Sequence, residues 1–184
     1  MATLAPGLKL RSQAPAFDLP GVDGKSYSLD KVRGPNGVVV MFICNHCPYV
    51  KAVVEKIVRD MADLKGQGIG SIAISSNDGK VYPEDSFDNM KKFAAQHRFG
   101  FPYVFDESQD IARAYDAVCT PEFYGFDRDL KLAYHGRLDA SGRSSDPNAR
   151  RELYDAMVAV AQGRAAPSDQ QPAVGCSIKW KTDD

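Results

Sequence analysis

Two cysteines three positions apart are the residues of this chain best suited to chemistry. Cys44 and Cys47 stand in the stretch Phe42–Lys51, with His46 between them and Pro48 directly after. This spacing lets two sulfurs approach within bonding distance at the start of a helix. One thiolate can then attack a substrate disulfide, and the second cysteine can resolve the mixed disulfide. The pattern therefore predicts a redox-active cysteine pair.

The segments on either side predict how the pair is held. Residues 38–43 are apolar at every position, which is typical of a strand buried on both faces. From Val50 to Leu64 the apolar residues recur with helical spacing, and Gly66 is a suitable stop. The pair is thus predicted to lie between the end of a central strand and the start of an amphipathic helix.

A helix start stabilises an anion, because its free N–H groups and its dipole favour negative charge. The dipole alone lowers a thiol pKa by about one unit from ~8.5. We expect Cys44, before the first full turn, to be the more exposed sulfur and the nucleophile. We expect Cys47 to be shielded and to resolve the mixed disulfide, and a protonated His46 to stabilise the thiolate.

The remaining segments alternate between strand and helix patterns, in the order βαβαβαββα behind a β-rich arm. This order predicts an α/β fold with a mixed central sheet flanked by helices. We expect one domain over residues 1–184, with an N-terminal β arm over 1–37 and a C-terminal tail with Cys176 over 163–184. Asp146-Pro147 predicts the start of the last helix.

Composition narrows the classes of function. The formal net charge is −1, with 43% hydrophobic and 26% charged residues, so we expect no nucleic-acid or membrane partner. The N-terminus has no apolar signal region, and no segment is long and apolar enough to span a bilayer, so we expect a cytoplasmic protein. The four cysteines are too few for a disulfide scaffold.

Two other interpretations of the cysteines stay open. They can be small buried hydrophobic residues, although Asn45 and His46 make this a polar turn. They can also hold zinc, although structural zinc usually uses two closely spaced ligand pairs and the other two cysteines are far apart in the sequence. Such a chain would be a non-catalytic metal-binding or redox-sensing module. The available ligands are Cys44, Cys47, Cys119 and Cys176, with His46 or His135.

Five sequence motifs together resemble one known group of proteins. The stretches CNHCPYVK, SSNDGKVYPEDS, CTPEFYGFD, YHGRLD and GCSIKWK look like the thioredoxin-fold redoxin superfamily, which contains peroxiredoxins and thiol–disulfide oxidoreductases. Within it, the chain resembles a peroxiredoxin-like, thioredoxin-related subfamily. The resemblance spans nearly the whole chain, and it implies a thioredoxin-like fold with a redox pair at Cys44 and Cys47.

The resemblance also gives Thr120-Pro121 a role. It implies a cis bond before Pro121, facing the cysteine pair, with the backbone of Thr120 free to pair with an extended substrate. Cys119 and Cys176 are then possible auxiliary thiols. Arg137 is a possible charge partner.

The resemblance leaves two reactions open. A peroxiredoxin-like peroxidase places a threonine three residues before its reactive cysteine, whereas this chain has Met41 before Cys44, and Cys44 itself before Cys47. We therefore expect thiol–disulfide exchange, with a peroxiredoxin-like thiol peroxidase as the alternative. The expected partners are protein or small-molecule disulfides or peroxides and a thioredoxin- or glutathione-type reductant. We expect no metal and no cofactor beyond the redox-active disulfide, and a monomer or homodimer.

Overall fold

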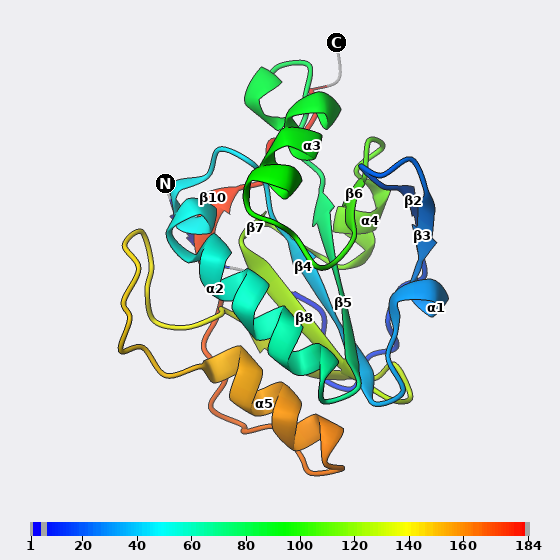
Figure 1. The fold of residues 1–184 in the computed structure, drawn as a ribbon, viewed down its shortest axis with the longest axis vertical. Coiled ribbons are helices and arrows are strands. Elements are labelled where there is room, and N and C mark those ends of the chain that lie inside the picture. The colour runs from blue at the N-terminus through cyan, green and yellow to red at the C-terminus, as the bar shows by residue number, and fades with distance from the viewer. Residues whose placement is uncertain (1, 5–6, 183–184) are drawn as a thin grey trace.

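A mixed sheet forms the centre of the molecule (Figure 1), built from a three-stranded part and a two-stranded part. The computed structural model describes residues 2–4 and 7–182. β5 and β6 pair in parallel, and β4, β8 and β9 pair antiparallel. The N–H of Ile43, just after β4, donates to the carbonyl of Ile74 in β5 at 3.0 Å and joins the two parts. The strands are β4 (Gly37–Phe42), β5 (Ile69–Ser75), β6 (Tyr103–Phe105), β8 (Glu122–Asp127) and β9 (Leu132–Gly136).

The helices cover both faces of this sheet. In Figure 1 the long helix α2 and the helix α5 lie side by side across the face turned to the viewer. The other face is covered by α4 and by segments of the N-terminal arm. The helical segments are α1 (Leu29–Val32), α2 (Pro48–Lys65), η1 (Pro83–Asp85, a 3₁₀ turn), α3 (Phe87–Gln96), α4 (Asp110–Ala114) and α5 (Glu152–Ala161).

Strand β4 is buried along its whole length, as its unbroken apolar run predicts. Val39 and Met41 belong to the core beneath α2 and α5, whereas Val40 and Phe42 belong to the core beneath α4. Alternate side chains of a strand point to opposite faces of the sheet, so one short segment contributes to both cores. The α/β fold predicted from the sequence is confirmed.

Helix α2 follows the predicted pattern closely. Its buried residues include Val50, Ile57 and Leu64, and it ends at Gly66. Cys47 is the N-cap and Pro48 is the first helical residue, a position where a missing N–H costs nothing. The predicted start of α5 is wrong: the helix begins five residues after Pro147, and the side chain of Asp146 instead accepts from the N–H of Asn148 at 2.9 Å.

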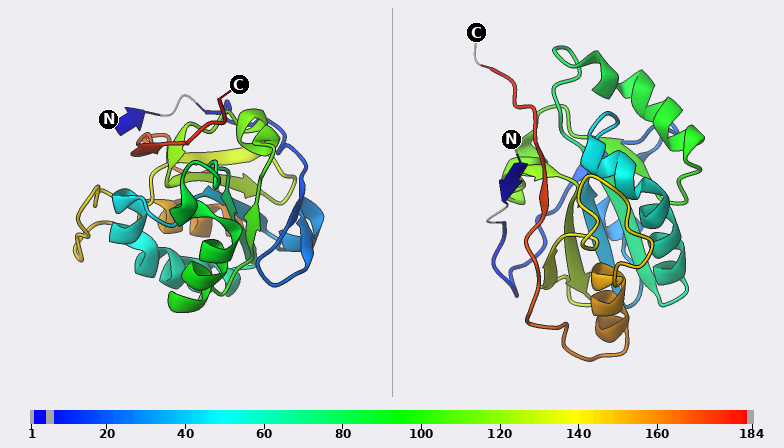
Figure 2. Two further views of the ribbon diagram at one scale, coloured as in Figure 1. Left: turned by 90° about the horizontal axis from the view of Figure 1, so that it is seen from above. Right: turned by 90° about the vertical axis from the view of Figure 1, so that its left-hand side faces the viewer.

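Two small sheets complete the fold. In the arm, β2 (Asp18–Pro20) and β3 (Ser26–Ser28) pair as an antiparallel hairpin. The tail contains a strand that the sequence did not indicate, β10 (Val174–Ser177), which pairs with β7 (Cys119–Thr120) and with β1 (Ala2–Leu4). Figure 2 shows β1 and β10 lying alongside each other at one edge of the molecule. The tail therefore returns to the domain.

Within the described residues, no helix combines the length and the apolar character needed to cross a membrane.

Candidate active site

The two cysteines of the pair lie at the junction of β4 and α2, and both are buried. Cys44 is 1% exposed and Cys47 is 0% exposed, so both residues are buried and the expected contrast between an exposed and a shielded sulfur is not seen. The side chain of Thr120 closes the site from the opposite side, with its Oγ1 at 3.5 Å from Sγ of Cys44. Sγ of Cys47 lies 3.3 Å from the carbonyl oxygen of Thr120.

The electrostatic surroundings of the two sulfurs differ. Hydrogen bonds from the thiols of Cys44 and Cys176 hold the pKa of Cys47 well below its usual range, although burial acts in the opposite direction. The hydrogen bond to Cys47, burial and the carboxylate of Asp85 raise the pKa of Cys44 well above its usual range. These surroundings favour a negative charge on Cys47 over one on Cys44.

The histidine of the motif pairs with a buried carboxylate. Nδ1 of His46 lies 2.6 Å from Oδ2 of Asp85, whose side chain is 0% exposed. The carboxylate also accepts from the N–H of Asn45 and from the side-chain amide of Asn77, both at 2.8 Å. The ring of His46 thus faces the carboxylate of Asp85. Its expected role in stabilising a thiolate stays a prediction.

Sequence reasoning missed Asp85 as a site residue. Asp85 directly precedes Ser86, the N-cap of α3, whose side chain accepts from the N–H of Asn89, and a carboxylate beside a helix start is easily taken for part of that cap. Asp85 is left free to turn inward. The ring of Tyr82, in the same loop, stacks parallel to that of His46 at a centroid distance of 6.2 Å and an angle of 4°.

The Thr120–Pro121 bond is cis, as the resemblance implies. The backbone of Thr120 is not free, however. Cys176 of β10 stands opposite Thr120 in an antiparallel ladder, and Ser177 stands opposite Cys119. The edge that we expected to receive an extended substrate is occupied by the tail of the same chain.

The remaining thiol, Cys119, faces a buried carboxylate. Cys119 is 0% exposed, and burial and the nearby Glu122 raise its pKa. Glu122, also 0% exposed, accepts from the hydroxyl of Tyr124 and contacts Nε2 of His135, both at 2.8 Å, and it accepts from the N–H of Val118 at 2.9 Å. Cys119 therefore belongs to a satisfied polar cluster behind the cis-proline.

Arg137, considered from the sequence as a charge partner, is engaged elsewhere. Its Nε donates to both carboxylate oxygens of Glu152, at 3.1 and 3.2 Å. The guanidinium thus pairs with α5, and the expectation that it serves the cysteines is not supported.

The metal-binding interpretation gains little from the geometry. In the part of the chain that the structure describes, the only three metal-ligating side chains with atoms all within 4.8 Å of one another are Cys44, His46 and Asp85. Two of these three side chains, His46 and Asp85, are already in contact with each other at 2.6 Å. The four-thiol arrangement considered from the sequence does not form such a group.

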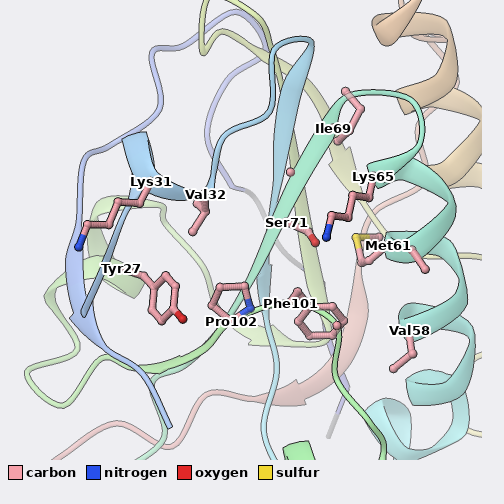
Figure 3. A pocket seen from close by; sticks show the side chains of 13 residues that line it. Tyr27, Lys31, Val32, Val58, Met61, Lys65, Ile69, Ser71, Phe101 and Pro102 are labelled. Atoms are coloured by element: carbon pink, nitrogen blue, oxygen red, sulfur yellow. The ribbon is translucent and has the colours of Figure 1, made fainter. Parts of the chain in front are cut away.

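A separate hollow of about 400 Å³ lies at the other end of α2 (Figure 3). Its walls come from the last turns of α2, the start of β5 and the arm, including Met61, Lys65, Ile69 and Tyr27. None of the four cysteines lines it. The candidate site is therefore a closed junction between elements, away from this hollow.

The fold and the site together define a thioredoxin-fold protein with a dithiol at the start of its long helix. The thioredoxin domain of a thiol-disulfide oxidoreductase from Bacteroides vulgatus has the same fold, with a TM-score of 0.61, 19% identity and coverage of 80% of this chain and 94% of that chain. The model of the AhpC/TSA family matches residues 10–135. The chain belongs to the AhpC/TSA family.

Two solved structures are similar over the full length. An uncharacterized conserved protein from Geobacillus kaustophilus is 45% identical, with a TM-score of 0.95 and coverage of 100% of this chain and 98% of that chain. A hypothetical protein from Sinorhizobium meliloti 1021 is 34% identical, with a TM-score of 0.94 and coverage of 98% and 100%. No curated protein matches.

Proposed function

We propose that this chain is a thiol–disulfide oxidoreductase in which Cys47 is the reacting thiolate and Cys44 completes the disulfide. The observation that carries this proposal is the contrast within the pair. Cys47 caps an 18-residue helix and accepts hydrogen bonds from other thiols, whereas Cys44 lies beside the carboxylate of Asp85. A helix start favours an anion, and a neighbouring carboxylate disfavours one. These roles are the reverse of those predicted from the sequence.

The reaction follows from this assignment. The Cys47 thiolate attacks one sulfur of a substrate disulfide, a mixed disulfide forms, and the second substrate sulfur leaves as a thiolate. Cys44 then attacks Sγ of Cys47 and releases the first substrate sulfur as a thiolate. Asp85, which has an oxygen within 4.8 Å of Sγ of Cys44, takes up the Cys44 proton. Two electrons pass from the pair to the substrate without a further cofactor.

Peroxide reduction is the second candidate function. A thiolate at Cys47, followed directly by Pro48, also suits attack on a peroxide oxygen, and the chain belongs to the AhpC/TSA family. Against it, Arg137 is bonded to Glu152 and leaves no assigned cation to orient a peroxide. We therefore place disulfide exchange first, with a thioredoxin- or glutathione-type thiol as the reductant.

The test traps the mixed disulfide. A Cys44→Ser variant in a Cys176→Ser background, treated with glutathione disulfide, should accumulate one glutathione adduct on Cys47, measured by intact and peptide mass spectrometry. A Cys47→Ser variant should form none, and Cys119→Ser should behave as the wild type. An adduct on Cys44 in Cys47→Ser, with no adduct on Cys47 in the double variant, would reverse the roles.

Two parallel measurements address the alternatives. Hydrogen peroxide consumption far faster than disulfide exchange by the wild type would favour the peroxidase. Stoichiometric zinc in protein purified without chelator would favour a metal-binding module over an enzyme.

A further inference from the structure

The tail strand β10 occupies the backbone edge that faces the cysteine pair. Cys176 stands opposite Thr120, and Ser177 stands opposite Cys119. Gly175 makes this close approach possible, because a Cβ there would lie 1.9 Å from the carbonyl oxygen of Thr120. The backbone of β10 is therefore in direct contact with the backbone at Thr120.

The residues after β10 fasten the tail to the domain. The N–H of Ile178 donates to the carbonyl of Val118 at 2.9 Å, and the Ile178 side chain is 3% exposed. The N–H of Lys179 donates to Oδ1 of Asn77 at 2.9 Å, and that same asparagine donates to Asp85 of the site. The position of β10 is thus fixed by burial and by hydrogen bonds.

This placement puts a third sulfur beside the pair. Cys176 packs against the core cluster that contains Cys44 and Cys47, and its thiol is a hydrogen-bond neighbour of the Cys47 sulfur. Burial and that hydrogen bond raise the pKa of Cys176 to about 11. Cys176 and Cys47 also meet at the same backbone group: Cys176 stands opposite Thr120 in the ladder, and Sγ of Cys47 lies 3.3 Å from the carbonyl oxygen of Thr120.

The three sulfurs also differ in access to solvent. Cys44 and Cys47 are buried, whereas Cys176 is partly exposed. A reactant arriving from solvent therefore meets Cys176 before it meets the pair.

We propose that Cys176 is a third redox thiol that takes the place of a substrate cysteine and carries the disulfide between the buried pair and solvent. This inference rests on the proposed function. Because β10 already pairs with the backbone at Thr120, an extended polypeptide cannot add a strand there. The external reactant is accordingly a low-molecular-weight thiol or disulfide.

The transfer conserves atoms and electrons. In the oxidised protein, the Cys176 sulfur, having lost its proton, attacks Sγ of Cys47; the Cys47–Cys176 bond forms and the Cys44–Cys47 bond breaks. Cys44 leaves as a thiolate and takes up a proton. A small thiol then attacks Sγ of Cys176 and expels Cys47, whose low pKa makes it a good leaving group. A second molecule of the small thiol releases Cys176, and the small thiol ends as its own disulfide.

The test maps disulfides after treatment with one equivalent of glutathione disulfide. In Cys44→Ser we expect the glutathione on Cys47 to be displaced by Cys176, giving a Cys47–Cys176 disulfide in most molecules, identified by peptide mass spectrometry without reduction. The matched control moves the thiol by one position, as Cys44→Ser/Cys176→Ser/Ser177→Cys. Neighbouring strand residues face opposite sides, and Oγ of Ser177 accepts from Nζ of Lys179, so this control should retain glutathione on Cys47.

A kinetic measurement on otherwise intact protein accompanies the mapping. Cys176→Ser should slow the reduction of the oxidised protein by glutathione by about tenfold or more, because attack must then reach a buried sulfur. Glutathione persisting on Cys47 in Cys44→Ser, with Cys176 free, would overturn the inference while leaving the proposed function standing. An equal yield of cross-link in the shifted control would also overturn it. Absence of any glutathione adduct on Cys47 in all variants would instead overturn the proposed function.

Discussion

The close contact between Gly175 and Thr120 allows the tail to be released by a single methyl group. In Gly175→Ala the new Cβ would lie 1.9 Å from the carbonyl oxygen of Thr120 and 2.6 Å from its carbonyl carbon, whereas real Cβ atoms stay beyond 3.0 Å. The partner is backbone and cannot swing aside, so β10 must retreat from β7. We expect the variant to fold, with the tail displaced.

The size of the effect follows from the hydrogen bonds that hold the strand. β10 and the residue after it pair with residues 118–120, and the bond from Ile178 to Val118 is 2.9 Å long. Losing two or three backbone hydrogen bonds at about 1 kcal/mol each costs roughly 2–3 kcal/mol. That raises the population of displaced tail by roughly 30- to 150-fold.

Amide hydrogen exchange measures this population directly, because protection reports the free energy of local opening. Protection of the Ile178 amide should fall by roughly 30- to 150-fold in Gly175→Ala, while the amides of β4 keep theirs. Gly100→Ala is the matched control, since no atom lies within 4 Å of its new Cβ. Equal protection of Ile178 in the two variants would refute the account of how the tail is seated.

Three further outcomes are expected. Alkylation of reduced Cys47 by iodoacetamide, followed by peptide mass spectrometry, should change little between about pH 7 and 8, because the lowered pKa leaves it ionised; the roughly eightfold rise of an ordinary thiol would contradict this. Asp85→Asn removes a negative charge beside Cys44 and should lower the pKa of that thiol, so its alkylation at about pH 8 should speed up; slower alkylation would count against the proposed electrostatics. The pKa of the Asp139 carboxyl is lowered in the folded protein: burial raises it, but the hydrogen bond from Lys56, at 2.7 Å, outweighs burial. The contact between Lys56 and Asp139 therefore stabilises the fold above about pH 4, and this stabilisation is lost as the pH falls through the folded-state pKa of Asp139. Lys56→Met should therefore lower the free energy of unfolding in urea by about 2 kcal/mol at neutral pH and much less in acid; a constant difference would contradict the linkage.

The sequence predicts the strand and the helix that hold the cysteine pair, because a local pattern of apolar residues specifies each of them. The apolar run of β4 fits a buried strand and the spacing from Val50 to Leu64 fits a helix with one buried face, and the structure confirms both. The position of the cysteine pair follows from those two elements. The start of α5 fails for a local reason: the side chain of Asp146 satisfies a nearby turn instead of a helix.

The parts of the site that the sequence did not predict depend on contacts between distant segments. The buried carboxylate of Asp85 accepts from the N–H of Asn45, which lies 40 positions away in the sequence, and no local pattern predicts that contact. β10 lacks a strand pattern of its own, and it becomes a strand through its pairing with β7 and β1. The proposed difference between the two sulfurs comes first from their contact with each other, but Asp85 and Cys176 add to it from 41 and 129 positions away from Cys44 and Cys47, respectively.

The cluster around Glu122 constrains how this protein can diverge. A fully buried carboxylate is tolerable only while Tyr124 and His135 satisfy it, and removing one partner of such a pair typically costs about 3–5 kcal/mol. A lone substitution at any of these positions is therefore penalised, whereas a joint replacement by apolar residues of similar volume is not. Among related chains, positions 122, 124 and 135 should accordingly change together. Such covariation would show that the polar cluster behind the cis-proline evolves as a single unit.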